Sequence, residues 1–271
     1  MIILEGKPVT EKIIERITEK QAKLTKKPCL AVLGIEGDDA SNVYIGRIEK
    51  NCAKYNIDFK LLMAKDETEF KNNFNEVKDN PEITGIMFQE PLPHTCASLI
   101  NELPAHKDVE GLNIINAGKL MLGQEDANIP CTSKAVIEVL DYYNIDITGK
   151  KVVIMGRSNI VGKPLIFQLL KKNATVTICH SKTTNLKEEL QTADVIVMAI
   201  GKAKFLTKDY IKENAILIDV GINFEDGKMV GDIDFESIED KASMCTPVPG
   251  GIGPITNVLL IENIITNALR D

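Results

Sequence analysis

The chain has 271 residues, of which 44% are hydrophobic and 26% charged, as is typical of a soluble globular protein with one large or two medium domains. Its net charge of −7 provides no general attraction to a phosphate backbone, so we expect no nucleic-acid partner. No apolar run reaches the roughly 18 residues that span a membrane, and the N-terminus lacks the features of a signal peptide. We therefore expect a cytoplasmic protein without membrane contact.

The spacing of cysteines and histidines argues against a metal site. The six cysteines are scattered without a C-x-x-C pair, and none of the three histidines belongs to an H-x-x-x-H pattern. Reduced thiols and the absence of a bound metal are therefore the expectation.

The first half of the chain alternates between helix-like and strand-like patterns. This rhythm predicts a mostly parallel sheet that is covered by helices. Ser41 and Asn42 are candidate N-caps of the second helix. The predicted helices are 9–24, 41–56 and 68–80, and the predicted strands are 28–37, 57–64 and 83–93.

A second alternating series follows a break in the rhythm near 113–135, which suggests a domain junction. A helix at 134–144 leads into this series. The predicted strands are 150–156, 174–180, 193–201 and 215–223. The sequence therefore predicts two α/β domains, with a Rossmann-like, doubly wound parallel sheet in the C-terminal one.

The first strand of the second series ends in a glycine turn, VVIMGRSNIVGKP, which opens a helix. The usual dinucleotide fingerprint is G-x-G-x-x-G, and here Ser158 replaces the second glycine. Gly156 can still form the tight turn, and Gly162 can let the helix lie close to the strand. Backbone N–H groups at the start of this helix are suited to a pyrophosphate.

The end of the next strand favours NADP over NAD. An NAD site usually has an acidic residue there for the ribose 2′-hydroxyl, but this chain has His180, Ser181 and Lys182. Together with Arg157 in the preceding turn, these donors suit a 2′-phosphate. The alternative is that Arg157 and Lys182 are solvated surface charges.

Six motifs together resemble the bifunctional methylenetetrahydrofolate dehydrogenase/cyclohydrolase family. Their order matches the family order, and the resemblance covers nearly the whole chain. The stretch TPVPGGIGPITNVLLIEN at 246–263 is the most specific of them. The others are FQEPLP, KDVEGLNIINAGKL, IPCTSKAV, GRSNIVGKP and IDVGIN.

The resemblance implies a folate-binding catalytic domain at 1–122 plus 256–271 and an NADP-binding Rossmann domain at 123–255, with a cleft between them. It also implies a homodimer that acts in one-carbon metabolism on tetrahydrofolate derivatives. In the family, NADP⁺ oxidises 5,10-methylenetetrahydrofolate to the methenyl cation, and water then opens that cation to 10-formyltetrahydrofolate.

The resemblance also assigns residues to the two sites. Tyr44, Gln89 and Glu110 match catalytic positions, while Glu90 replaces a usual leucine and Glu110 a usual aspartate that holds the pterin ring. Pro249, Gly250 and Gly251 are expected to shape the folate site. The cofactor contacts expected are Gly156, Arg157, Ser158, Ile160, His180, Ser181, Lys182, Ala199, Gly201, Gly221, Ile222 and Thr256.

One family position departs from the pattern in a way that bears on the chemistry. Family members carry Tyr-x-x-x-Lys on a helix, and here Tyr44 is followed by Ile48, four residues on and so expected on the same face. Hydride transfer mainly needs positioning, which supplies on the order of 7–11 kcal/mol in favourable cases. Ring opening needs proton transfers, for which a positioned acid or base contributes about 10²–10⁴-fold.

We therefore expect a dehydrogenase whose cyclohydrolase step is weak or absent. Three alternatives stay open. The first is a fully bifunctional enzyme in which Glu90 or a water relay replaces the lysine. The second is a folate- and NADP-binding regulatory protein without turnover. The third is a dehydrogenase of the shikimate type, although we find no Lys–Asp pair in a suitable context.

Overall fold

The computed structural model describes residues 1–37 and 39–270, apart from the side chains of 39–43. The chain divides into two compact units, which are described separately. Unit 1 comprises Met1–Lys12 and Pro130–Thr256, and unit 2 comprises Ile13–Ile129 and Asn257–Asp271.

These units differ from the predicted domains in residues 1–12, residues 123–129 and Thr256. Residues 1–12 belong to unit 1 because Ile2 and Ile3 form an edge strand that pairs with Met244 and Cys245. Residues 123–129 belong to unit 2, where Asn128 hydrogen-bonds within that unit.

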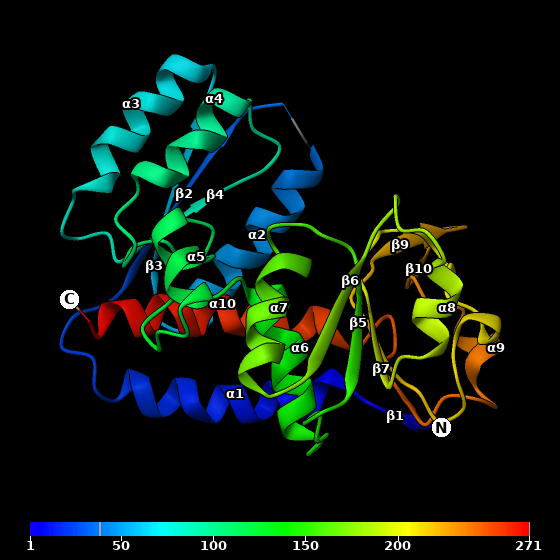
Figure 1. The fold of residues 1–271 in the computed structure, drawn as a ribbon. Coiled ribbons are helices and arrows are strands. Elements are labelled where there is room, and N and C mark those ends of the chain that lie inside the picture. The colour runs from blue at the N-terminus through cyan, green and yellow to red at the C-terminus, as the bar shows by residue number, and fades with distance from the viewer. Residues whose placement is uncertain (38, 271) are drawn as a thin grey trace. The chain divides into compact units, whose positions relative to one another are not determined.

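Unit 1 contains a six-stranded sheet in which every paired strand is parallel (Figure 1). The four predicted strands are β8, β7, β5 and β6, which lie next to one another in the sheet, so the Rossmann-like sheet is confirmed. The sequence did not predict β1 and β11, because two residues are too few to show a period. In spatial order the strands are β1 (Ile2–Ile3), β11 (Met244–Cys245), β8 (Ile216–Asp219), β7 (Val195–Met198), β5 (Lys151–Met155) and β6 (Thr175–Cys179).

Helices cover both faces of this sheet. Figure 1 shows α6 (Cys131–Tyr142) and α7 (Gly162–Lys171) on one side, with α8 (Leu186–Gln191) and α9 (Phe235–Ile238) on the other. Strands β7 and β8 are almost wholly buried, which explains their continuous apolar sequences. The hairpin of β9 (Asn223–Glu225) and β10 (Lys228–Val230), and the short 3₁₀ helix η2 (Lys208–Tyr210), complete this unit.

Unit 2 is built on a three-stranded parallel sheet with the order β3-β2-β4. Phe88 of β4 lies edge-to-face against Phe70 and Phe74, with ring centroids 5.3 and 5.7 Å apart. Both partners belong to α3 (Glu67–Lys78), which therefore packs on one face of the sheet. The strands are β2 (Cys29–Ile35), β3 (Asp58–Ala64) and β4 (Gly85–Phe88).

Helix α5 was not predicted and lies where the sequence pattern breaks. Its apolar side chains Ile114, Ile115 and Met121 are exposed and Asn116 is buried, and its eight residues are too few to establish a helical period in the sequence. The Asn113 side chain caps it by accepting a hydrogen bond from the N–H of Ile115. The remaining elements around the sheet are α2 (Asp39–Lys54), α4 (His94–Ala97), η1 (Ser98–Glu102) and α5 (Ile114–Met121).

Two long helices begin in unit 1 and end in unit 2, namely α1 (Gly6–Gln21) and α10 (Ile252–Ala268). Within unit 2 the two helices are joined through Glu262, which is 2% exposed. Its carboxylate accepts hydrogen bonds from Arg16 Nε at 3.0 Å and from Lys20 Nζ at 3.0 Å.

We predict that Glu262→Ala lowers the free energy of unfolding by about 2–4 kcal/mol, because it leaves two partly buried cations without this carboxylate. Urea unfolding followed by circular dichroism would measure the change. The matched control is Glu76→Ala, which removes an exposed carboxylate paired with Lys60 at 2.6 Å and should change stability by less than about 1 kcal/mol. Equal effects of the two variants would contradict the assignment.

Candidate functional site

The turn after β5 places backbone against backbone at two glycines. Gly156 has a φ of +119°, and a Cβ atom there would lie 2.2 Å from the carbonyl oxygen of Ala199. A Cβ atom at Gly162 would lie 2.0 Å from the carbonyl oxygen of Gly156. Side chains at either position would force the strands and the helix apart. The cradle expected of a dinucleotide site is therefore present.

Ser158, which stands at the second fingerprint position, closes the turn before α7. Its Oγ accepts a hydrogen bond from the N–H of Val161 at 3.1 Å. Among the described residues, no side chain caps the N-terminus of α7, so its first N–H groups are suited to a phosphate. Arg157 and Ile160 are exposed on the same turn.

The turn after β6 is closed by its own side chains. Thr183 Oγ1 accepts from the N–H of His180 at 2.9 Å, and His180 Nδ1 accepts from the N–H of Lys182 at 3.1 Å. Ser181 and Lys182 are thereby exposed. His180 is used to order the turn, in agreement with a strand-end residue rather than a metal ligand.

The turns after β7 and β8 contain the other expected cofactor contacts. Gly201 is exposed with a φ of +63°, and Ala199 is partly buried. Gly221 is buried, whereas Ile222 beside it is 56% exposed. Because β5, β6, β7 and β8 are parallel, all four turns lie together at the carboxyl ends of the strands, which we call the cofactor edge of the sheet.

The proline- and glycine-rich stretch forms a tight loop between β11 and α10. Gly250 has a φ of +107°, and its carbonyl oxygen accepts from the N–H of Gly6 at 2.8 Å. A Cβ atom at Gly6 would lie 1.9 Å from the carbonyl oxygen of Gly251, so the loop packs directly on the start of α1. Pro249 is exposed, and Thr256 Oγ1 donates to the carbonyl oxygen of Gly253 at 2.8 Å.

In unit 2, helix α2 presents Tyr44 and Ile48 to different surroundings. Ile48 is 3% exposed and belongs to a buried stripe with Ile45 and Cys52, whereas Tyr44 is 40% exposed. Both residues lie four apart on α2, as expected for a shared face, and Tyr44 lies at the exposed edge of the buried stripe. The helix begins at Asp39, before both predicted caps, whose side chains lie outside the described residues.

Gln89 and Glu90 follow directly after β4. The backbone N–H of Gln89 donates to Leu33 at 2.8 Å, and its Nε2 donates to the carbonyl oxygen of Glu90 at 2.6 Å. Glu90 is exposed, and its Oε2 accepts from the N–H of Leu92 at 2.7 Å across a cis Glu90–Pro91 bond. Gln89 is buried at this strand end.

Asp108 orders the loop that carries Glu110. Its carboxylate is fully buried and accepts from the N–H groups of Gly111 and Asn113, each at 2.8 Å, and from Asn116 Nδ2 at 2.9 Å. A buried carboxylate with these donors fixes the backbone around it. Asp108 therefore orders this loop.

Asparagines tie this loop to α10, which the sequence did not predict. Asn128 Nδ2 donates to the carbonyl oxygen of Asp108 at 2.7 Å and to Asn267 Oδ1 at 3.0 Å. Asn263 Nδ2 donates to the carbonyl oxygen of Val109 at 2.8 Å. Asn263 and Asn267 are polar residues in a mostly apolar helix, which is the signal that could have indicated a buried polar contact.

Glu110 is partly buried and has a strongly altered pKa. Burial is the largest cause, and together with the charge of Asp108 it raises the pKa of its carboxyl to about 8. A hydrogen bond with the backbone of Phe88 opposes this change, while Glu90 adds to it. The carboxyl therefore carries a proton at neutral pH in the unliganded protein.

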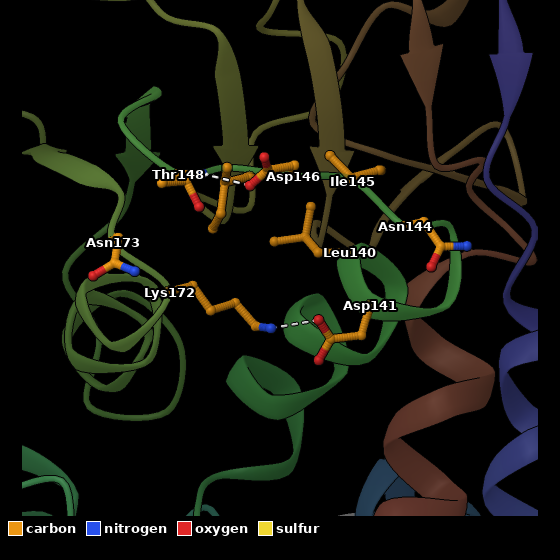
Figure 2. Close-up of a pocket in the computed structure, with 9 residues that line it drawn as sticks. Leu140, Asp141, Asn144, Ile145, Asp146, Thr148, Lys172 and Asn173 are labelled. Atoms are coloured by element: carbon orange, nitrogen blue, oxygen red, sulfur yellow. Dashed lines mark hydrogen bonds and ion pairs between the residues drawn. The ribbon is translucent and has the colours of Figure 1, made fainter.

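A separate pocket of about 400 Å³ lies at the opposite edge of the unit 1 sheet (Figure 2). It is lined by the end of α6, the turn into β5 and residues 172–173. Figure 2 shows Lys172 paired with Asp141, and the N–H of Thr148 donates to Asp146 at 2.9 Å. Because it lies at the amino ends of β5 and β6, it is distinct from the expected cofactor edge.

The described part of the chain contains no group of three His, Cys, Asp or Glu side chains placed to hold a metal ion. Within the described residues, no helix is both long enough and apolar enough to cross a membrane.

Fold and site define a two-domain α/β protein with a dinucleotide-binding Rossmann domain. The NAD(P)-binding domain model of tetrahydrofolate dehydrogenase/cyclohydrolase matches residues 130–271, and the catalytic domain model matches residues 4–110. The chain therefore belongs to the tetrahydrofolate dehydrogenase/cyclohydrolase family of enzymes. The resemblance stated from the motifs is confirmed.

Similar proteins span the full length of the chain. Two relatives named bifunctional protein FolD, from a Sulfurihydrogenibium species and from Bacillus subtilis, are each 42% identical; they cover 98% and 99% of the chain, which covers 96% and 98% of them. The bifunctional enzyme FolD from Campylobacter jejuni is 39% identical, with a TM-score of 0.93 and coverage of 99% and 98%.

A more distant structure was solved with a cofactor. The Trypanosoma brucei dehydrogenase-cyclohydrolase, complexed with NADP and an inhibitor, is 27% identical with a TM-score of 0.88, covering 100% of this chain and 98% of that one. A shikimate dehydrogenase from Aquifex aeolicus is 12% identical with a TM-score of 0.54, so it shares the fold alone.

We predict that Gly162→Ala weakens NADPH binding at least about tenfold, because the new methyl group would meet the Gly156 carbonyl. Titration of NADPH fluorescence would measure the dissociation constant. Gly118→Ala is the matched control: it lies in α5 with no atom within 4 Å of the added Cβ. It should leave binding unchanged and stabilise the protein by about 0.5–1 kcal/mol. Unchanged binding by Gly162→Ala would refute the close-approach argument.

We also predict a pH-dependent stability from Glu110. Its carboxyl pKa is raised from 4.5 to about 8, so the folded state binds more protons than the unfolded state between these values. The stabilisation by the bound proton is complete below pH 4.5 and declines as pH rises through 8, by up to about 1.4 kcal/mol per unit. Glu110→Gln should flatten this decline in urea unfolding; an unchanged slope would contradict the assignment.

Proposed function

We propose that this chain is an NADP-dependent methylenetetrahydrofolate dehydrogenase that oxidises 5,10-methylenetetrahydrofolate to 5,10-methenyltetrahydrofolate. The observation that carries the proposal is the match of both family domains to a chain whose glycine cradle retains its close backbone approaches. In this proposal unit 2 binds the folate and unit 1 binds the dinucleotide. When bound, the nicotinamide supplies the hydride acceptor.

The preference for NADP is supported by the turns after β5 and β6. Arg157, Ser181 and Lys182 are exposed there, and no acidic residue ends β6. Arginine and lysine bind a 2′-phosphate, which an acidic residue would repel. The T. brucei relative was solved with NADP, which agrees with this preference.

Unit 2 supplies the folate contacts in the proposal. Glu110 accepts from the paired donors of the pterin amino edge, which requires its ionised form, and Tyr44 borders the ring. Gln89 and Glu90 line the same site in unit 2. For hydride transfer these groups need mainly to position the folate, because its two nitrogens stabilise the cation that forms.

The second step of the family is ring opening of that cation by water. The relatives at 42% identity are named bifunctional, and this favours the alternative that the present chain also performs the step. The residue at position 48 favours a slow step. Ile48 is a buried aliphatic residue, and it cannot donate or accept the proton that the leaving ring nitrogen requires. We propose that ring opening persists at most at a reduced rate.

Two further expectations belong to this proposal. A homodimer is implied by the resemblance and can be checked by light scattering. A single assay distinguishes the proposed dehydrogenase from the alternative, a regulatory protein that binds folate and NADP without turnover. Only the enzyme forms NADPH from methylenetetrahydrofolate and NADP⁺.

We predict that wild-type protein forms NADPH from methylenetetrahydrofolate but opens authentic methenyltetrahydrofolate slowly. Ile48→Lys should accelerate ring opening by about 10²–10⁴-fold, because a lysine among apolar neighbours has a lowered pKa and can exchange protons. Both half-reactions are followed spectroscopically on each variant.

The matched control is Ile45→Lys, which introduces the same charge on the buried stripe one turn earlier. It should not accelerate ring opening. Equal ring opening by wild type and Ile48→Lys, or a wild-type rate comparable to that of a lysine-containing relative, would reject the reduced second step. Either result would leave the proposed dehydrogenase activity unaffected.

A further inference from the structure

The strand order of unit 1 reverses beside β5, at the side of the sheet where a dinucleotide is expected to bind. The chain runs from β5 outward to β6 and then returns to β7 on the other side of β5, so the order reverses there. Ligands of such sheets bind outside the carboxyl ends of the strands at this reversal. The turn after β7, residues 199–202, is therefore one wall of the expected site.

A single buried carboxylate holds this wall. Asp232 is fully buried, and its Oδ2 accepts from the N–H groups of Ile200 at 2.7 Å and Gly201 at 3.1 Å. Its Oδ1 accepts from the N–H of Lys202 at 2.8 Å. Three consecutive backbone N–H groups thus point at one side chain that lies about thirty residues further along the chain.

The same carboxylate also reaches the turn after β8. Asp232 Oδ1 accepts from Asn223 Nδ2 at 2.9 Å. A Cβ atom at Gly221 would lie 2.2 Å from this carboxylate, so the turn passes directly over it. Asp232 therefore links the turns that follow two neighbouring strands of the sheet.

A second buried aspartate fixes Asp232 itself. Asp219, at the end of β8, accepts from the N–H of Asp232 at 3.0 Å and from that of Ile233 at 2.8 Å. It also accepts from the N–H of Gly221 at 3.0 Å. An aspartate that ends an apolar buried strand is the sequence signal for this arrangement, which motif comparison did not single out.

Burying two neighbouring carboxylates is costly unless donors compensate each of them. For Asp232 the compensation comes from the backbone of the expected cofactor turn. Asp232 is in turn the acceptor for the N–H groups of residues 200–202, so the conformation of this turn depends on its side chain.

We propose that Asp232 is a positioning residue of the dinucleotide site, which holds the turns after β7 and β8 in the conformation that binds NADP. The inference rests on the NADP binding proposed above. Asp232 lies behind the turns and acts through their backbone, without a contact of its own to the reacting atoms.

The test compares Asp232→Asn with a matched variant, Asp194→Asn, at the amino end of β7. The amide keeps the size of the side chain but turns an N–H group toward backbone N–H groups. Asp194 precedes β7 and likewise accepts from a backbone N–H, that of Lys151 at 2.7 Å. Asp194→Asn therefore removes a similar contact of the same sheet away from the expected cofactor edge.

Two quantities are measured on the full chain without folate, namely the dissociation constant of NADPH by fluorescence titration and the amide hydrogen exchange of residues 199–202. Asp232→Asn should raise the dissociation constant about tenfold or more and accelerate exchange in this turn. Asp194→Asn should change the dissociation constant less than about twofold and leave exchange at 199–202 unaltered.

Wild-type affinity in Asp232→Asn, or equal weakening in both variants, would overturn the inference, because the second result indicates general destabilisation. Failure of the wild-type protein to bind NADPH would instead reject the proposed function.

If Asp232→Asn does not fold, Asn223→Ala decides the question. It removes one donor to Asp232 and leaves the carboxylate in place. Weaker NADPH binding with faster exchange at 199–202 supports the positioning role, and wild-type values of both reject it.

Discussion

Buried aspartates that accept backbone N–H groups organise the binding loops of both units. In unit 2, Asp108 gathers the N–H groups of the loop that carries Glu110. In unit 1, Asp232 gathers those of 200–202 at the end of β7. An irregular loop has no neighbouring strand to satisfy its N–H groups, and a buried carboxylate supplies the missing acceptors. The same interaction therefore shapes the loops expected to bind the folate and the dinucleotide.

The chemistry proposed for the chain follows from how charge is distributed around these loops. Hydride transfer requires geometry, which the glycine approaches at 156 and 162 and the ordered loops provide. Ring opening requires a proton donor, and position 48 holds an aliphatic side chain within a buried stripe. Among the described carboxyls of unit 2, Glu110 has the most strongly raised pKa, about 8. Its proposed role, however, is to hold the pterin.

Much of the fold could be predicted from local patterns. The apolar strands of the unit 1 sheet and the glycine turn after β5 follow directly from periodicity and from fingerprint spacing. Helix α5 could not be predicted, because its eight residues are too few to establish a helical period. The two-residue strands β1 and β11 could not be predicted, because pairing between residues 2–3 and 244–245 joins segments far apart in the chain.

The sequence by itself determined the family, the parallel sheets and the residue types at the expected site, because these depend on local spacing and on motifs. Only the tertiary structure decided that Ile48 is buried while Tyr44 is exposed, that Glu110 keeps its proton near neutral pH, and that Asp232 serves two turns at once. Burial and carboxylate–backbone contacts depend on segments far apart in the chain, so no local pattern contains them.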